Sequence, residues 1–426
     1  MAAWLLAGWL VHLAGALVFP HPAPDTARYM EEARSLWEEG SFAIHGRPTA
    51  FDGPLYALLL APFHGLARML GGAEALSIWL RLPGILLGGA VPVLVLLVIR
   101  ETGLSRFAAF GGATLALVNP LLIGASGFVL TESAQAAFLS LAVWRTVRAF
   151  RAGGTWRWLG AGAGWGAAAL CRPTPLLFLP LLAMLGGPVW NRRGVAAGGK
   201  GRAAGWLRCA GLFLGGAAAV TAPWMVRNAV QFGAWIPVSL RGGQVLWAGT
   251  VSGGQWDDAT MLRLRTELVG PDFRLRELET ERILLAEALK TIRRQPLKWI
   301  AAMPAKAARL WLGLPGAVFV LREHPLLARG VRLYEAVLAA GALASIALLW
   351  PGLRRPGRCV LLAIPLAYLF YETGLYMVLL ALPRFRIPLL PLRAMIMAPL
   401  LDAAWRRRGR HRVQAAPPRG TAPVPG

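Results

Sequence analysis

The sequence predicts an all-α polytopic membrane protein with about ten transmembrane helices. Of its 426 residues, 56% are hydrophobic and 15% are charged, whereas soluble domains carry about 25% charged residues. Apolar runs long enough to cross a bilayer recur along the chain. Short basic segments separate many of these runs, as expected when positively charged loops face the cytoplasm.

The candidate spans have close to the length that a bilayer core requires, about 20 residues, or are somewhat shorter. The first has no charged region before it and no clear cleavage site after it, so we expect a retained span and not a cleaved signal peptide. Two short spans flank "CRPTP", where the prolines end or kink a helix. The spans cover approximately residues 3–19, 78–98, 107–123, 128–147, 158–171, 175–189, 209–226, 333–350, 359–381 and 387–405.

Arginine and lysine gather in alternate gaps between these spans. If the C-terminal tail is cytoplasmic, an alternating trace of the chain places every basic gap on the cytoplasmic side. We therefore expect a multi-pass protein of the cytoplasmic (inner) membrane. The basic gaps and the basic tail lie near residues 100–106, 145–157, 192–208, 354–358 and 406–412.

Two long segments of the membrane domain, residues 1–405, then fall on the outer side. They are a first outer loop at 20–77 and a large outer loop at 227–332. Both have the apolar periodicity of helices, and such amphipathic helices are typical of elements that lie along a membrane surface. The tail, 406–426, is basic and proline-rich, and we expect its last part, "RVQAAPPRGTAPVPG" at 412–426, to be disordered.

The net charge of +24 could indicate a nucleic-acid-binding protein. We instead predict no nucleic acid and membrane lipid as the partner, because most arginines lie in the short gaps between apolar runs. Cys171, Cys209 and Cys359 are isolated from one another, so neither a disulfide framework nor a zinc site is predicted.

Three carboxylates lie on the outer side. Asp25 is suited to cap a helix, but it would also share a helix face with Arg28 and Tyr29, and the pattern leaves both roles open. Asp52 precedes Gly53 and Pro54, so turn chemistry alone explains it. Glu132 lies about one turn into a span, where a charge is costly, and this favours a functional role.

Several arginines also lie at the outer ends of spans, against the positive-inside tendency. Arginine can extend to lipid headgroups, and it is also the residue best suited to bind a phosphate with two hydrogen bonds. Together with the outer carboxylates, these arginines suggest an anionic phosphate group held near a base. They are Arg172, Arg227, Arg384 and Arg386.

Ordered stretches along residues 20–400 resemble the GT-C glycosyltransferases, polytopic enzymes that use polyprenyl-phosphate sugars. The most similar branch contains bacterial protein mannosyltransferases and lipid A aminoarabinose transferases. The stretches are "PDTARYMEEARSLWEEGSF", "FDGPLYALLLAPFHGLAR", "VLTESAQAAFLSL", "CRPTPLLFLP", "APWMVRNAVQFGAWIPVS" and "PRFRIPLLPLRA".

This resemblance implies roles for the outer residues. Asp25 is the expected catalytic base, and Glu132 occupies the place of a second acidic residue that orients groups or binds metal. Asp52 aligns with an acidic position that some relatives use near a metal, so a divalent metal ion is the one cofactor implied. The expected phosphate-binding residues are Arg172, Arg384, Arg386, Arg28 and Arg227, and Tyr29 and Asn228 are expected to contact substrate.

The sequence also departs from these relatives in two places. Gly53 stands where some relatives have a lysine, so one phosphate contact is missing or is supplied by another residue. Thr26 stands where protein mannosyltransferases have an acidic residue, which argues against protein O-mannosylation.

These residues predict inverting transfer of a sugar from a polyprenyl-phosphate donor to an acceptor lipid, glycan or protein at the outer face of the membrane. A base for the acceptor and cations for the departing phosphate are the groups that this reaction needs. The alternative is a transporter or flippase of a lipid-linked anionic glycan, which would place charges along a path through the membrane. The concentration of charged candidates on one side favours the enzyme.

Overall fold

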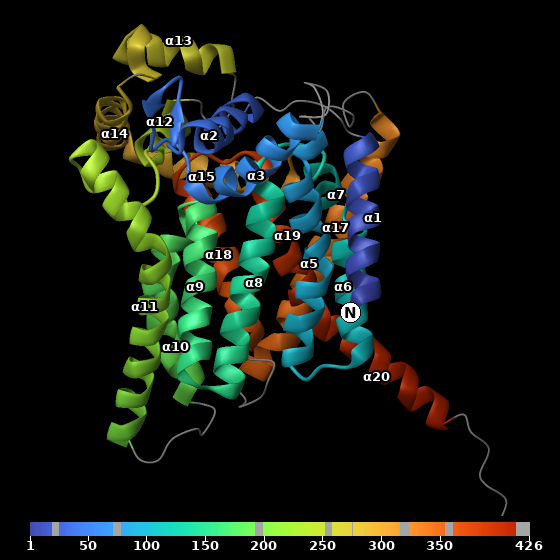
Figure 1. Ribbon diagram of the computed structural model, residues 1–426. Coiled ribbons are helices and arrows are strands. Elements are labelled where there is room, and N and C mark those ends of the chain that lie inside the picture. The colour runs from blue at the N-terminus through green and yellow to red at the C-terminus, as the bar shows by residue number, and fades with distance from the viewer. Residues whose placement is uncertain are drawn as a thin grey trace, which may run out of the picture.

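The computed structural model is built almost entirely from helices, which confirms the predicted fold class (Figure 1). In the residues that it describes, β structure is limited to one two-stranded hairpin. The described residues are 1–18, 25–70, 78–191, 199–251, 258–274, 276–315, 324–353 and 361–414.

Four segments of the described chain are long and apolar enough to cross a membrane, and the apolar helices α1, α6 and the first part of α10 are shorter. The four segments are α5 (Leu82–Glu101), residues 203–232 of α11 (Gly199–Phe232), residues 325–348 of α17 (Pro325–Leu353), and a broken segment formed by η3 (Pro383–Leu389), α19 (Leu390–Ile396) and the first part of α20 (Ala398–Gln414).

The remaining helices of the bundle run alongside these segments (Figure 1). Close packing between α9 and α11 depends on glycine, because a Cβ atom on Gly162 would lie 1.8 Å from the carbonyl oxygen of Phe213. Such small residues let membrane helices approach each other closely. These helices are α1 (Ala2–Val18), α6 (Arg106–Leu117), α7 (Pro120–Ala125), α8 (Thr131–Ala152), α9 (Thr155–Cys171), α10 (Thr174–Asn191) and α18 (Ala363–Val378).

Two span boundaries show how proline divides the apolar runs. The segment expected at 107–123 is split, because the side chain of Asn119 accepts hydrogen bonds from the first amides of α7 and Pro120 occupies its first turn. The expected separation at "CRPTP" is confirmed, since α9 ends at Cys171 and α10 begins at Thr174.

The segments that the sequence predicts on the outer side form a layer at one end of the bundle, at the top of Figure 1. A hairpin was not expected in the first outer loop. Its tight turn requires positive φ values, 51° at His45 and 71° at Gly46. The elements of this layer are α2 (Thr26–Glu39), β1 (Ala43–Ile44), β2 (Arg47–Pro48), α3 (Pro54–Leu70), α12 (Gly242–Val251), α13 (Asp258–Val269), η1 (Pro271–Arg274), α14 (Glu277–Arg294) and α15 (Pro296–Leu312).

The described residues of the two loops expected at 20–77 and 227–332 lie in this layer, in the last turns of α11 and in the first turns of α17, which begins at Pro325 and not at residue 333 as expected. Residues 20–24, 71–77 and 415–426 lie outside the described residues. Disorder was expected from residue 412, but α20 continues to Gln414, so residues 412–414 are helical, and the rest of that prediction falls outside the described residues.

Candidate active site

Asp25 stands immediately before α2, where a capping role was one of the two interpretations. Its side chain makes no capping hydrogen bond to the helix. Instead, Oδ1 accepts from Nη1 of Arg28 at 3.0 Å and Oδ2 accepts from Nη2 of Arg384 at 2.6 Å. Both carboxylate oxygens therefore bind guanidinium groups, one from the same helix and one from η3 at the far end of the sequence.

Asp52 lies beside Asp25, at the turn that precedes α3. One oxygen accepts from Nε of Arg28, and the other accepts from Nη1 of Arg241 at 2.8 Å. The following residue, Gly53, presses against α9, where a Cβ atom would lie 2.2 Å from the carbonyl oxygen of Leu170. A lysine cannot replace glycine in this packing, which explains why this chain departs from the relatives that have one.

Glu132 lies in the first turn of α8 with 1% of its side chain exposed. It accepts a hydrogen bond at 2.6 Å from Nη2 of Arg172, the residue that ends α9. Nε of Arg172 donates to the hydroxyl of Thr131 at 2.8 Å, which fixes the plane of the guanidinium. Nε of Arg384 lies 4.0 Å from the same carboxylate oxygen, so Glu132 also faces the arginine that binds Asp25.

These contacts join into one continuous row of alternating charges, which we call the charge row. Six ion pairs connect its members, and a guanidinium stands at each end. Four cations face three carboxylates, so the charge row has one positive charge in excess. In order, its members are Arg241, Asp52, Arg28, Asp25, Arg384, Glu132 and Arg172.

Electrostatics fix the ionisation of the centre of the charge row. Burial raises the pKa of Asp25, but the guanidinium groups of Arg384 and Arg28 outweigh burial and hold this pKa well below its usual range. Burial alone would lower the pKa of Arg28, and the neighbouring carboxylates raise it above the ordinary value. Asp25 is therefore an anion and Arg28 a cation at any physiological pH.

Donor groups next to Asp25 are left without protein partners. Nη2 of Arg28 and Nε of Arg384 are buried and have no hydrogen-bond partner in the described part of the protein. On the acidic side, Oε2 of Glu132 is likewise buried without one. Buried polar groups of this kind cost free energy unless a ligand or water satisfies them. The two N–H groups are therefore free to donate to a water molecule or to an anion that reaches Asp25.

Tyr29 packs against Arg28 of the charge row. Its ring is 4% exposed and meets Tyr56 edge-on at 5.2 Å between centroids. The guanidinium of Arg28 lies 5.1 Å from the Tyr29 centroid and 4.9 Å from that of Phe51. The two rings hold the guanidinium between them, so Tyr29 positions Arg28.

Other expected site residues have different partners. Nη1 and Nη2 of Arg227 donate to the carbonyl oxygens of Thr49 at 2.7 Å and Phe42 at 2.9 Å. Asn228 is fully buried and donates to the carbonyl oxygens of Ile236 and Val238. These two residues fasten the hairpin and the following loop to α11 and do not join the charge row.

Arg386 also binds main-chain carbonyls. It is 1% exposed, and its Nη1 donates to the carbonyl oxygens of Leu310, at 2.8 Å, and Gly313. Those carbonyls lie at the C-terminal end of α15, where the last turn of a helix lacks internal partners. Arg386 therefore caps α15, although it stands two residues from Arg384 in the same motif. Its Nε lies 3.9 Å from an oxygen of Glu335, a carboxylate outside the charge row, and has no hydrogen-bond partner in the described residues.

The carboxylates do not fit the divalent metal ion that was expected at Asp52. Both oxygens of Asp52 and both of Asp25 already bind guanidinium groups. Divalent cations such as Mg²⁺ and Ca²⁺ need several free oxygen ligands. Among the described residues, no group of three or more histidine, cysteine, aspartate or glutamate side chains could hold a metal ion.

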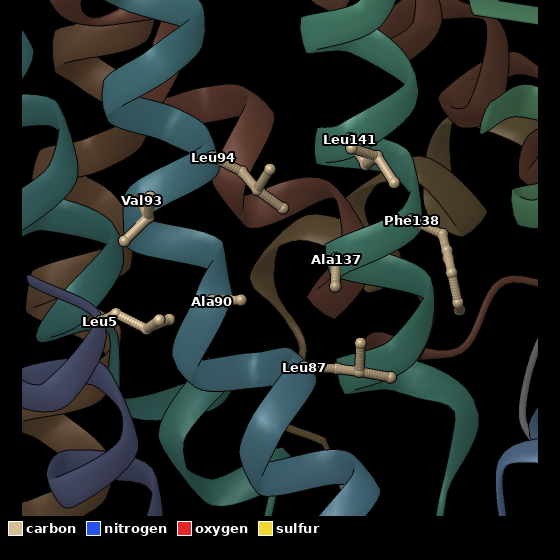
Figure 2. A pocket seen from close by; sticks show the side chains of 8 residues that line it. All are labelled: Leu5, Leu87, Ala90, Val93, Leu94, Ala137, Phe138 and Leu141. Carbon is tan, nitrogen blue, oxygen red and sulfur yellow. The ribbon is translucent and has the colours of Figure 1, made fainter. Parts of the chain in front are cut away.

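An apolar pocket of about 230 Å³ lies deeper in the bundle, between α1, α5 and α8. Figure 2 shows Leu5, Leu94, Ala137 and Leu141 among the side chains around it. The α8 residues of this pocket are turned by about 140° to 240° from Glu132 around the helix axis. The pocket therefore opens on another side of α8 than the charge row does.

Arg241 was missed by the sequence analysis. It stands in "SLRGGQ" before α12, outside any apolar run, and its only signal was a positive charge in an outer loop. The contact that gives it a place in the charge row spans 189 residues of sequence. Thr131, which orients Arg172, gave no stronger signal, because a threonine at a helix start is common.

Comparisons with known proteins agree with this architecture. A family model described as dolichyl-phosphate-mannose-protein mannosyltransferase matches residues 53–199, about a third of the chain. Among curated proteins, no relative matches.

Among solved structures, the archaeal oligosaccharyltransferase AglB from Archaeoglobus fulgidus is similar in two states. In complex with an inhibitory peptide and a dolichol-phosphate, it aligns with a TM-score of 0.57, 15% identity and coverage of 99% of this chain and 52% of its own. In the apo form, the values are 0.58, 13%, 97% and 51%. The chain thus spans about half the length of this protein.

ArnT from Cupriavidus metallidurans bound to undecaprenyl phosphate aligns with a TM-score of 0.45 and 15% identity, over 96% of this chain and 78% of its own. Nearly the whole chain has the fold of the matched half of AglB, so the resemblance to GT-C glycosyltransferases is confirmed at the level of the fold.

Proposed function

We propose that the protein transfers a sugar from a polyprenyl-phosphate donor to an acceptor at the outer face of the cytoplasmic membrane. The observation that supports this most is the charge row, in which a carboxylate lies between two arginines with unpartnered N–H groups. The matching family model is described by a dolichyl-phosphate-linked donor, and a fold relative was solved with a dolichol-phosphate, so both point to the same donor class.

The charge balance fits this donor. A sugar-phosphate-prenyl diester carries one negative charge, which equals the positive excess of the charge row. When the sugar leaves, the phosphate becomes a monoester whose second pKa is about 6, so negative charge grows on its oxygens. Preorganised guanidinium groups stabilise charge that develops in the transition state, a contribution worth about 3–4 kcal/mol per donor group in other enzymes.

Arg384, Arg28 and Arg172 hold the donor phosphate in this proposal. Arg384 has the central part because it contacts both Asp25 and Glu132. Glu132 keeps Arg172 and Arg384 facing the same point. Arg227, Arg386 and Asn228, which bind main-chain carbonyls, stabilise the surrounding scaffold.

Asp25 acts as the base. Its low pKa makes it a poor proton acceptor while two guanidinium groups bind it. A donor phosphate that takes up hydrogen bonds from Arg384 and Arg28 weakens these contacts and so raises the proton affinity of Asp25. The acceptor O–H or N–H then attacks the anomeric carbon, its proton passes to Asp25, and the bond from the anomeric carbon to the phosphate oxygen breaks.

This displacement inverts the anomeric configuration and needs no covalent sugar–enzyme intermediate. The alternative, a flippase without chemistry, has no support from the comparisons. The test adds a polyprenyl-phosphate sugar, labelled in the sugar, to membranes that contain the protein together with their own acceptor lipids, glycans and proteins. We expect labelled product of inverted configuration together with free polyprenyl phosphate, whereas movement of intact donor across the bilayer without cleavage would contradict the proposal.

A further inference from the structure

α15 carries an apolar stripe that none of the described elements covers. Leu297 is 80% exposed, Ile300 53% and Leu312 76%, and the positions between them on the same face are also apolar. The opposite face is buried through Lys306 and Leu310. The exposed members of the stripe are Leu297, Ile300, Ala301, Pro304, Ala305, Ala308 and Leu312.

This helix lies at the level where the spans end. Nζ of Lys306 donates to the carbonyl oxygens of Leu379, at 2.8 Å, and Val378, at 3.4 Å, at the end of α18. Figure 1 shows α15 beneath α2 and next to the upper ends of the bundle helices. Exposed cations stand at the beginning of the stripe, namely Arg293, Arg294 and Lys298.

We propose that α15 lies in the outer lipid–water interface of the membrane and that its contacts fix the position of Arg384. The apolar face extends along the whole helix, so it is better suited to contact a lipid surface than to bind a single polypeptide segment. The adjoining cations complement the phosphates of anionic headgroups. The effect on Arg384 rests on the proposed function, whereas the lipid contact does not.

Three contacts connect α15 with the segment that carries Arg384. Lys306 binds the carbonyls at the start of this segment, and Arg386, two residues after Arg384, binds the carbonyls at the end of α15. Between them, Gly313 packs on Pro383, where a Cβ atom would lie 2.6 Å from the proline Cγ. Arg384 therefore stands between two points that α15 holds, and displacement of α15 moves it relative to Asp25.

The lipid contact is tested with the full chain in vesicles that contain phosphatidylglycerol. A Cys359→Ser background leaves Cys171 and Cys209, which are buried. An environment-sensitive fluorophore is attached at Ile300→Cys or, as a matched control, at Arg263→Cys on α13, which stands farthest from the spans in Figure 1. We expect a lipid with a shallow quencher to reduce the fluorescence at position 300 about twofold or more, and not at 263. An unquenched probe at 300 overturns the proposal, because water or a protein would then cover the stripe.

The effect of α15 on the position of Arg384 is tested by measuring the Michaelis constant for the polyprenyl-phosphate sugar donor. We expect Lys306→Gln to raise this constant about tenfold, the loss of roughly one hydrogen bond of a charged group, with a smaller change in kcat. Lys306→Arg restores it. Gly313→Ala, which displaces the end of α15 from Pro383, provides a second variant with the same expected effect if Lys306→Gln does not fold. Wild-type constants in both Lys306→Gln and Gly313→Ala overturn the coupling, whereas absence of turnover in the wild type contradicts the proposed function and leaves the quenching result to stand by itself.

Discussion

Two groups of outer arginines look alike in the sequence and differ in their partners. Arg384 and Arg172 bind carboxylates of the charge row. Arg227 and Arg386 bind main-chain carbonyls and fasten a hairpin and a helix end. A carbonyl contact uses the guanidinium as a structural connection, whereas a carboxylate contact keeps a charge available for exchange with another anion. Membership of the charge row therefore separates the proposed phosphate site from the scaffold, because Arg386 also faces a carboxylate, Glu335 at 3.9 Å, outside that row.

The largest effect is expected at the carboxylate between the arginines. Asp25→Asn keeps the size of the side chain but removes the base, and we expect kcat to fall by about 10²- to 10⁴-fold. Glu39→Gln, an exposed carboxylate at the end of the same helix, serves as the control and keeps the wild-type rate. An unchanged transfer rate in Asp25→Asn would show that the charge row has only a structural role. The two groups of arginines would then not differ in function.

The same low pKa gives a pH dependence. Because the arginines hold the pKa of Asp25 below its usual range, the carboxylate stays ionised down to below about pH 4. We expect the protonation of Asp25 in the free protein to contribute no fall in kcat/KM between about pH 8 and 5. A pH–rate profile that falls through a group with a pKa near 5 in the wild type but not in Asp25→Asn would contradict this assignment.

Substitution of the arginines that bind main-chain carbonyls should lower the stability of the protein and leave the rate of sugar transfer unchanged. Arg227→Met removes two hydrogen bonds from a cation to carbonyl groups, so we expect a loss of about 2 kcal/mol or more in the free energy of unfolding. Thermal denaturation in detergent measures this loss. Activity per folded molecule should remain close to that of the wild type, and a selective loss of donor affinity would instead place Arg227 in the phosphate site.

A buried carboxylate on α2 sharpens the comparison, because no ion pair connects it with an arginine in the described residues. Glu32 is 0% exposed, and neither of its oxygens has a hydrogen-bond partner in the described residues. Burial, helped by the charge of Asp52, raises the pKa of Glu32 well above its ordinary value. Glu32 is therefore neutral in the fold, and its contribution to stability is present below its ordinary pKa and is lost as the pH rises through the raised value.

We therefore expect Glu32→Gln to gain stability over the wild type as the pH rises, by at most about 1.4 kcal/mol per pH unit. Thermal midpoints of both proteins from about pH 5 to pH 9 measure the difference. A constant difference over this range would mean that Glu32 does not titrate in the fold.

The smallest effect is expected from metal removal. Since guanidinium groups occupy both oxygens of Asp25 and of Asp52, chelation by EDTA should leave the transfer rate unchanged. A rate that falls with EDTA and returns with added Mg²⁺ or Mn²⁺ would show that the carboxylates exchange arginine for metal during turnover.

Much of this picture was within reach of the sequence. Glu132 and Arg172 could be selected because charges at membrane depth are costly and these two fell on the same side. The break at Asn119 was hidden within an apolar run, although Pro120 was a local signal for it. Arg227 and Arg386 could not be told from Arg384, because their carbonyl partners lie on elements far away in the sequence. Arg241 had no local signal, since only the folded chain brings it to Asp52.

One comparison tests the central claim most directly, namely equilibrium binding of a polyprenyl phosphate to Arg384→Met and to Arg227→Met, each in liposomes. We predict that Arg384→Met raises Kd about tenfold or more, the cost of losing a charged hydrogen bond, and that Arg227→Met leaves Kd at the wild-type value. Equal weakening in both variants, or a change only in Arg227→Met, would contradict the assignment of the phosphate site to the charge row.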